Sequence, residues 1–281
     1  MAKKSFYLVG PGAVGKVLAR RLVRAGWVCA GVCGRGSVQG RRLARELGAP
    51  YVNSVDKVEY SHGVLLLTVF TNRIAPLANE LARAKLDWTK IHVVHTSGAL
   101  DVKVLAPLAK RGATVAACHP FMTFPRFGGS VRAGSKEDLT EPRVPIVYGL
   151  DGDAKGTRAA KLLVKGLGGI PIEVKGGDRV AYHAAAVLAC TLLGATVAMA
   201  EEILVKLKVP KREAHLAVAS ISQQTLANFG ECGMARAWTG PQTRGDRKSV
   251  GMHLRALKRL DPEIQRVYES LSEWVLKQGA R

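Results

Sequence analysis

Short apolar runs alternate with amphipathic stretches from the N-terminus to about Val174. Each apolar run predicts a strand, and the period of three to four residues after it predicts a helix. The predicted strands are Ser5–Val9, Val28–Cys33, Val64–Val69, Ile91–His95, Thr114–Cys118, Val144–Tyr148 and Ile170–Val174. The predicted helices are Val14–Ala25, Gln39–Leu47, Ile74–Ala84, Val102–Arg111 with Asp101 as N-cap, and Ala154–Leu167. This alternation predicts an α/β fold with a mostly parallel sheet and helices on both faces.

The pattern changes after Gly176-Gly177, where only helical periods continue. The predicted helices run from a cap at Asp178 to about Lys208, over Lys211–Phe229, over Asp246–Leu260, and from Asp261-Pro262 to Lys277. The stretches Phe124–Pro142 and Glu231–Gly245 have no period and predict loops. We therefore expect a Rossmann-type domain over residues 1–176 and an all-helical domain over residues 177–281.

Composition and charge narrow the class of protein. Of the 281 residues, 47% are hydrophobic, which is too many for a disordered chain. A formal charge of +20 attracts anions, but the basic residues lie on outward helix positions without interleaved exposed aromatics, so we expect no dedicated nucleic-acid binding. Cys29 and Cys33 are four residues apart on a predicted strand and should share one face as small buried side chains.

We expect no targeting segment, because Met1–Lys4 leads directly into an apolar strand. Ala184–Ala200 is uncharged, yet it is short for a bilayer span and rich in small residues. We expect this helix to be buried between other helices, and the protein to be cytoplasmic and without membrane contact.

The segment Gly10-Pro11-Gly12-Ala13-Val14-Gly15 follows a strand and opens a helix, which is the context of a dinucleotide-binding turn. Gly10 permits a tight turn, Gly12 lets the backbone approach a pyrophosphate, and Gly15 lets the helix pack on the strand. The free amides at the helix start, including those of Ala13 and Val14, would face the phosphates.

The end of the second strand indicates which dinucleotide is bound. It has no carboxylate for ribose hydroxyls before Glu46, whereas Arg35 and Ser37 can bind a 2′-phosphate. We therefore expect NADP(H) as cofactor, with the alternative that Arg35 is an ordinary surface arginine.

From these motifs, the chain resembles the superfamily of pyrroline-5-carboxylate reductase, ketopantoate reductase and 6-phosphogluconate dehydrogenase. It is most similar to a family of uncharacterised oxidoreductases with a Rossmann-like domain and a helical C-terminal domain of unknown function. The segments that carry the resemblance are Tyr7–Gly15, His95–Asp101, His119–Phe124, Asp178–Ala189 and Thr239–Asp246. The resemblance implies a homodimer formed through the helical domain, by residues after Asp178.

Candidate chemical groups lie where strands end and where the helical region begins. Thr68, Thr96 and Ser97 follow strands and could contact the nicotinamide, although simple capping of the strand ends is equally open. His119 precedes a proline, and we expect it to have a structural role. His92 and His95 fall on opposite strand faces, so we expect no metal site there.

His183 is the strongest candidate for a general acid, since the resemblance places a catalytic lysine of related enzymes at a comparable position. The same resemblance implies an active-site amide at position 191, but this chain departs from that pattern with Thr191, which can still form a hydrogen bond. His183 and Thr191 should follow one helical stripe. Arg244, after the turn Thr239-Gly240-Pro241, could hold an anionic substrate. A core histidine and a solvated arginine remain the alternatives.

Together these residues predict an NADP-dependent oxidoreductase that moves a hydride to or from a small, anionic carbonyl or imine compound. Two other classes stay open on the sequence. One is a catalytically idle NADP-binding sensor or scaffold, and the other is a nucleic-acid-associated protein that uses its positive charge.

Overall fold

The computed structural model describes residues 4–125 and 142–279, which gather into two compact units. The first unit extends to Cys190 and the second begins at Thr191. The predicted boundary after residue 176 follows the last strand, whereas the units divide farther on, within a long helix. Most of the loop predicted between Phe124 and Pro142 lies outside the described residues.

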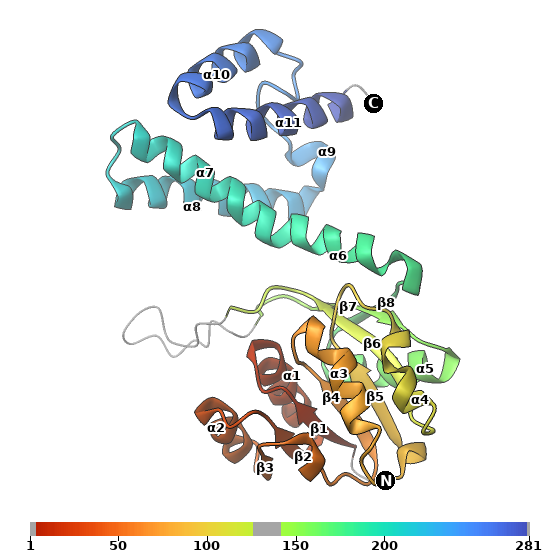
Figure 1. Ribbon diagram of the computed structural model, residues 1–281. Coiled ribbons are helices and arrows are strands. Elements are labelled where there is room, and N and C mark those ends of the chain that lie inside the picture. Colours follow the sequence, from red (N-terminus) through yellow and green to blue (C-terminus); the bar gives the residue numbers. More distant parts are fainter. Residues whose placement is uncertain (1–3, 126–141, 280–281) are drawn as a thin grey trace. The chain divides into compact units, whose positions relative to one another are not determined.

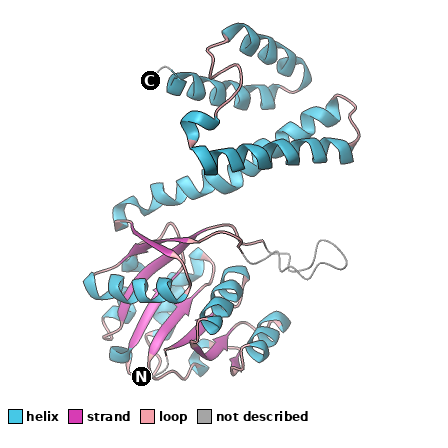
Figure 2. Cartoon of the chain, turned by 180° about the vertical axis from the view of Figure 1, so that it is seen from behind, coloured by secondary structure: helices cyan, strands magenta, loops and turns pink. Residues whose placement is uncertain are grey.

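An eight-stranded sheet forms the centre of the first unit, in the order β3-β2-β1-β4-β5-β6-β7-β8 (Figures 1 and 2). Its strands are β1 Ser5–Val9, β2 Val28–Cys33, β3 Tyr51–Val52, β4 Gly63–Leu67, β5 Ile91–His95, β6 Thr114–Phe121, β7 Val147–Asp151 and β8 Ile170–Glu173. All neighbouring strands are parallel except β6 and β7. The prediction of a mostly parallel sheet is confirmed, and only the two-residue β3 was not predicted.

Helices cover both faces of this sheet. They are α1 Ala13–Arg24, α2 Val38–Glu46, α3 Thr71–Leu81, α4 Ala106–Ala109 and α5 Ala154–Gly166. Short 3₁₀ turns lie at η1 Val55–Lys57, η2 Trp88–Lys90, η3 Val102–Leu105 and η4 Gly176–Asp178. The helix predicted over Val102–Arg111 is thus split into η3 and α4, and Asp101 caps η3 through the amide of Lys103.

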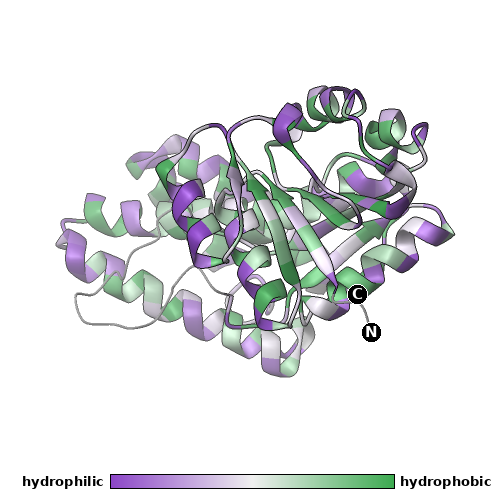
Figure 3. Ribbon diagram, turned by 90° about the horizontal axis from the view of Figure 1, so that it is seen from below, coloured by the Kyte–Doolittle hydropathy of each residue, from purple (hydrophilic) through white to green (hydrophobic). Residues whose placement is uncertain are grey.

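Two buried clusters hold the layers together. Side chains of α1, α2 and α5, such as Leu18, Leu43 and Leu163, pack on one face of the sheet. Side chains of α3 and α4, such as Leu77 and Leu108, pack on the other. In Figure 3 the strands are mostly coloured as hydrophobic, while the helices carry both kinds of residue. This is the arrangement that the amphipathic periods predict.

The prediction that Cys29 and Cys33 share a face is wrong. Cys29 belongs to the cluster on the α1 side and Cys33 to the cluster on the α3 side, although both are buried. The register between β1 and β2 shifts by one residue, so that Phe6 pairs with Cys29 but Tyr7 pairs with Gly31. A bulge of one residue reverses the alternation of side chains beyond it.

The long helix predicted from Asp178 to Lys208 is interrupted. It consists of α6 Arg179–Val187, a π-helical turn η5 Leu188–Leu192, and α7 Leu193–Lys206. Asp178 precedes it but forms no side-chain cap bond. The other helices of the second unit are α8 Lys211–Cys232, α9 Met234–Ala237, α10 Arg247–Leu260 and α11 Pro262–Gly279. In this unit α7 contacts α8, and α10 contacts α11.

The expectation that this long helix is buried between other helices is wrong for the single chain. None of the most apolar window within Gly176–Lys206 is buried, and Leu188 and Leu192 are exposed. By length and composition alone, the helix could also cross a membrane, a criterion that core helices of water-soluble proteins meet as well. Its apolar surface therefore lacks cover within the part of the chain that the structure describes.

Candidate functional site

The glycine turn after β1 has the geometry that a dinucleotide requires. Gly10 has a φ of +101°, a conformation that side chains disfavour. A Cβ at Gly15 would lie 2.5 Å from the carbonyl oxygen of Gly10, so only glycine lets α1 approach so closely. A Cβ at Gly12 would meet nothing within 4 Å, which leaves this side of the turn open to a ligand.

The start of α1 fits a phosphate group. Gly12 is its N-cap without a side-chain cap bond, and its first turn contains no acidic residue. The first amides, including those of Ala13 and Val14, therefore keep their donors and a positive helix end. The hydroxyl of Thr68 donates to the carbonyl oxygen of Gly10 and so fixes the turn. Its predicted contact with nicotinamide stays a prediction.

The turn after β2 holds the residues expected to bind a 2′-phosphate. Arg35 is exposed, and the hydroxyl of Ser37 accepts from the amide of Gly40 as the cap of α2. Arg41 donates to the carbonyl oxygen of Gly36 at 2.8 Å and lies over the ring of Tyr51. Arg41, the second arginine near this turn, is thereby held in place, whereas Arg35 is exposed to solvent.

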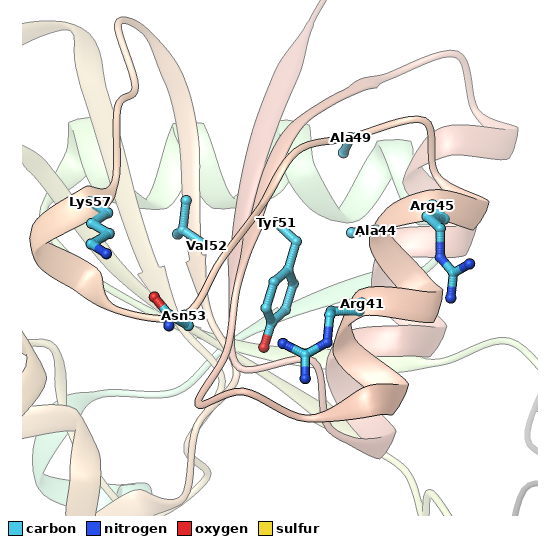
Figure 4. A pocket seen from close by; sticks show the side chains of 8 residues that line it. All are labelled: Arg41, Ala44, Arg45, Ala49, Tyr51, Val52, Asn53 and Lys57. Atoms are coloured by element: carbon cyan, nitrogen blue, oxygen red, sulfur yellow. The ribbon is translucent and has the colours of Figure 1, made fainter.

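A cavity of about 590 Å³ lies beside this turn, between α2 and the end of β3. Figure 4 shows Arg41 and Tyr51 side by side at its mouth, with Asn53 and Lys57 from the chain after β3. The Tyr51 hydroxyl donates to the carbonyl oxygen of Gly34 at 2.7 Å. The cavity is therefore basic and adjoins the turn predicted to recognise the cofactor.

The ends of β4 and β5 are linked by hydroxyl groups. Ser97 is buried; its hydroxyl lies 3.2 Å from that of Thr71 and accepts from the amide of Leu100. The Thr96 hydroxyl donates to the carbonyl oxygen of Leu67. The structure thus brings the predicted residues of these strand ends together, with their hydroxyls already bonded to the chain.

Tyr182 and a second histidine lie beside His119 at the same edge. His119 lies on β6 two residues beyond Ala117, which pairs with the last residue of β5, His95. Its Nδ1 is 3.0 Å from the Tyr182 hydroxyl, and its ring centroid is 5.7 Å from that of His183. We call His119, Tyr182 and His183 the histidine cluster.

Two glycines make room for the histidine cluster. A Cβ at Gly98 would lie 2.3 Å from Cδ2 of His183 and 2.9 Å from Nε2 of His119. A Cβ at Gly149 would lie 2.5 Å from the Tyr182 ring. The rings therefore rest directly on backbone from the turn after β5 and from β7.

The cluster is arranged to keep His119 neutral. Burial, then the positive charges of His183 and Arg179, lowers the pKa of His119 to about 3. The Tyr182 hydroxyl is nearer to Nδ1 than to the His119 carbonyl oxygen, 3.0 Å against 3.5 Å. This favours the tautomer in which Tyr182 donates to Nδ1 and Nε2, beside Gly98, carries the ring hydrogen.

His95 lies behind the cluster and has a structural role. Its Nδ1 accepts from the amide of Ser97, so its Nε2 donates to the carbonyl oxygen of Asp101 at 3.1 Å. Burial lowers its pKa to about 4. The neutral ring thus fixes the turn that carries Ser97 and Gly98.

Thr191 and Arg244 belong to the second unit. Thr191 lies in the π-helical turn, which interrupts the period that was to place it on one stripe with His183. That predicted stripe is not continuous. Arg244 is exposed, in a loop where Gln242 donates to the Tyr268 hydroxyl and to Ser272.

Sequence reasoning did not single out Tyr182, Arg179, Gly98 or Gly149, and it gave His119 a structural role. The sequence carries little indication of their roles, because each role depends on a partner residue on another strand or helix. Only the adjacency of Tyr182 to His183, and the motif His119-Pro120, could have suggested them.

Comparison with known proteins agrees with this architecture. Residues 1–120 match a Rossmann-like domain, and residues 146–275 match the domain of unknown function DUF2520. No curated protein matches the chain. Among solved structures, a protein from Bacteroides fragilis to which an NADP oxidoreductase activity is ascribed is 24% identical, with a TM-score of 0.74 and 98% of each chain covered.

Two further solved structures are pyrroline-5-carboxylate reductases. The enzyme from Coxiella burnetii is 14% identical, with a TM-score of 0.63 over 98% of this chain and 99% of that one. The enzyme from Plasmodium falciparum, solved with NADP bound, is 11% identical, with a TM-score of 0.59 over 98% and 99%. At these identities the likeness concerns the fold. By its two matched regions, the chain combines a Rossmann-like domain with a C-terminal DUF2520 domain.

Proposed function

We propose that the protein is an NADP(H)-dependent oxidoreductase acting on a small, anionic carbonyl or imine compound. One observation carries the proposal: the open glycine turn after β1 and the histidine cluster beside the end of β6 lie on the same carboxyl edge of one sheet. In open parallel sheets this edge binds dinucleotides, beside the point where strand order reverses. Here that point lies between β1 and β4.

The chain's own residues suit each part of NADP(H). Gly10, Gly12 and Gly15 with the first amides of α1 would hold the pyrophosphate. Arg35 and Ser37 would bind the 2′-phosphate, with Arg41 in support. Thr68, Thr96 and Ser97 would lie near the nicotinamide. The solved structures of similar fold that are described with NADP support this choice.

The histidine cluster would serve the proton transfer. When bound, NADPH supplies the hydride. His183 gives a proton to the oxygen or nitrogen of the substrate that gains charge, because histidine is the commonest general acid in enzymes. His119 stays neutral and donates from Nε2 to the same atom, which fixes its position. Arg244 would hold a carboxylate of the substrate, and Thr191 would form a hydrogen bond to it.

Cofactor recognition is tested by titration calorimetry with NADPH and NADH. Arg35→Ala should weaken NADPH binding by about 1–3 kcal/mol, the scale of a lost charge-assisted bond, and leave NADH nearly unchanged. Arg83→Ala, an exposed arginine two residues after the end of α3, is the control. Equal losses for both cofactors would show that Arg35 does not recognise the 2′-phosphate.

Catalysis is tested with a panel of small carbonyl and imine acids, followed by nicotinamide absorbance. His183→Ala should lower the catalytic constant by roughly 10²–10⁴-fold with NADPH affinity intact, whereas the exposed His62→Ala should have no effect. Arg244→Ala should mainly raise the Michaelis constant. A structure with NADPH in which the His183 ring lies more than about 8 Å from the nicotinamide C4 would contradict the role of His183.

A further inference from the structure

Arg179, the first residue of α6, is the most completely buried charged side chain beside the histidine cluster, with an exposed fraction of 0%. Its Nη2 donates to the carbonyl oxygen of Ser97 at 2.7 Å, and its Nη1 lies 3.5 Å from that of Gly149. One guanidinium therefore joins the turn after β5, strand β7 and helix α6. These are the three segments on which the cluster rests.

The charge of Arg179 is not neutralised by an ion pair among the described residues. The nearby carboxylates are bonded elsewhere: Asp151 accepts from the amide of Val102, and Asp101 from that of Lys103. The Nε of Arg179 has no hydrogen-bond partner in the described part of the chain. A buried guanidinium normally finds a carboxylate, because an unpaired buried charge is costly. A buried arginine without such a partner therefore indicates a role for its charge other than an ion pair.

The groups around Arg179 respond to its charge. Its guanidinium carbon lies 5.9 Å from the centroid of the Tyr182 ring, whose face attracts cations. His119 is faced by Arg179, Tyr182 and His183 from α6, and by His95 from β5. After burial and His183, the charge of Arg179 is the next cause that disfavours protonation of His119.

We infer that Arg179 is the positioning residue of this site: it locks the Ser97-Gly98 turn and Tyr182 beneath the two histidines and places a fixed positive charge under the reacting group. This inference rests on the proposed function, in which negative charge develops on the substrate as hydride arrives. A preorganised charge close to the atom that gains negative charge stabilises such a transition state without reorganisation. It also favours the neutral form of His119, which can donate from Nε2.

The test compares Arg179→Met, which removes the charge, with Arg179→Lys, which keeps it, and with Arg158→Met on the exposed side of α5. Histidine rings labelled with ¹³C are titrated by NMR in the full chain. In Arg179→Met the midpoint of His119 should rise by about one pH unit, within the range that one nearby charge produces. In Arg179→Lys and Arg158→Met it should stay near that of the unchanged protein.

An unchanged midpoint in Arg179→Met, or equal rises in the Met and Lys variants, would overturn the inference, because equal rises indicate entry of water. Should Arg179→Met fail to fold, ¹⁵N-arginine spectra of the unchanged protein decide. We expect one arginine whose guanidinium hydrogens exchange slowly with water. Absence of such a signal would contradict the buried position of Arg179.

These readouts do not depend on the cofactor. NADPH binding to the unchanged protein is followed separately, by the fluorescence of NADPH. Absence of NADPH binding in the unchanged protein would defeat the proposed function alone, and the histidine titration would still test Arg179.

Discussion

Gly98 has no Cβ, so the rings of His119 and His183 lie directly against its backbone. In Gly98→Ala the new Cβ would overlap the ring of His183, which can shift because it is the far end of a side chain. We expect the protein to fold with a loss of about 1–3 kcal/mol in unfolding free energy, typical of overpacking, and with a displaced His183. Urea unfolding and histidine NMR measure both effects.

The control for this change is Gly177→Ala, where a Cβ would meet nothing within 4 Å. It should leave both the stability and the His183 signal unchanged. An unaltered His183 signal in Gly98→Ala would contradict the close contact between the His183 ring and the Gly98 backbone.

His95 should make the protein less stable in mild acid. Its pKa in the folded protein is about 4, below the ordinary value of 6.5. As the pH falls below about 6.5, His95 takes up a proton in the unfolded chain but not in the folded protein. The free energy of unfolding therefore decreases between about pH 6.5 and pH 4, by at most about 1.4 kcal/mol per pH unit. Urea unfolding between pH 7 and 4.5 measures this slope.

His95→Gln should reduce that slope, and exposed His62→Gln should not. The carboxylates with lowered pKa, such as Asp246 and Asp261, act only at lower pH and do not confuse the comparison. The same slope in both variants would exclude His95 as its source.

At the scale of single residues, the sequence predicts what depends on neighbours in the chain. The roles of Gly10 and Gly15 followed from a local strand–turn–helix motif, and the structure gives both the expected geometry. The seat of His183 on Gly98 joins residues 85 positions apart, and a single sequence carries no sign of such a contact. Arg179 could not be foreseen for the same reason, since its acceptors lie on two other segments.

At the scale of elements, two aspartates at helix starts make a matched pair. Asp246 caps α10 through the amide of Ser249 at 3.0 Å, while Asp178 precedes α6 without a side-chain bond. Asp246→Ala should lower the unfolding free energy by about 1 kcal/mol, the usual cost of a lost cap, and Asp178→Ala should have little effect. Thermal unfolding of both variants compares them, and equal losses would contradict the assignment.

The ends of helices and strands were predictable where the hydrophobic period stops at a residue that disfavours the element. Val28–Cys33 and Ile91–His95 coincide with the predicted strands, because Gly34 follows the first and Lys90 precedes the second. The sequence did not predict the bulge in β2 or the π-helical turn at Leu188–Leu192. Each adds one residue without changing the apolar character of the segment. A pattern of hydrophobic positions does not reveal such insertions.

At the scale of the whole molecule, exposed apolar side chains on α8 and at the π-helical turn predict self-association. Leu216, Ile221 and Leu226 on α8 are exposed in the single chain, as are Leu188 and Leu192 at the π-helical turn. Contiguous exposed apolar surface usually marks an interface. We therefore expect a homodimer through the helical region, with twice the chain mass of 30.1 kDa by light scattering.

Ile221→Lys should shift this dimer toward the monomer, whereas Val38→Lys, at an exposed position on α2, should not. A monomer at micromolar concentration of the unchanged protein would sink this expectation. Association only in detergent or with vesicles would instead favour a membrane partner for the apolar helix.

The π-helical turn also bears on how related genes should be aligned with this one. A π turn closes its hydrogen bonds one residue later than an α turn, so it holds one residue more over the same stretch of helix. Loss of a single codon between Leu188 and Leu192 would restore an uninterrupted helix and move every later position by one column. The turn therefore has the form of a one-residue insertion, and a gap placed here keeps the columns on both sides in register.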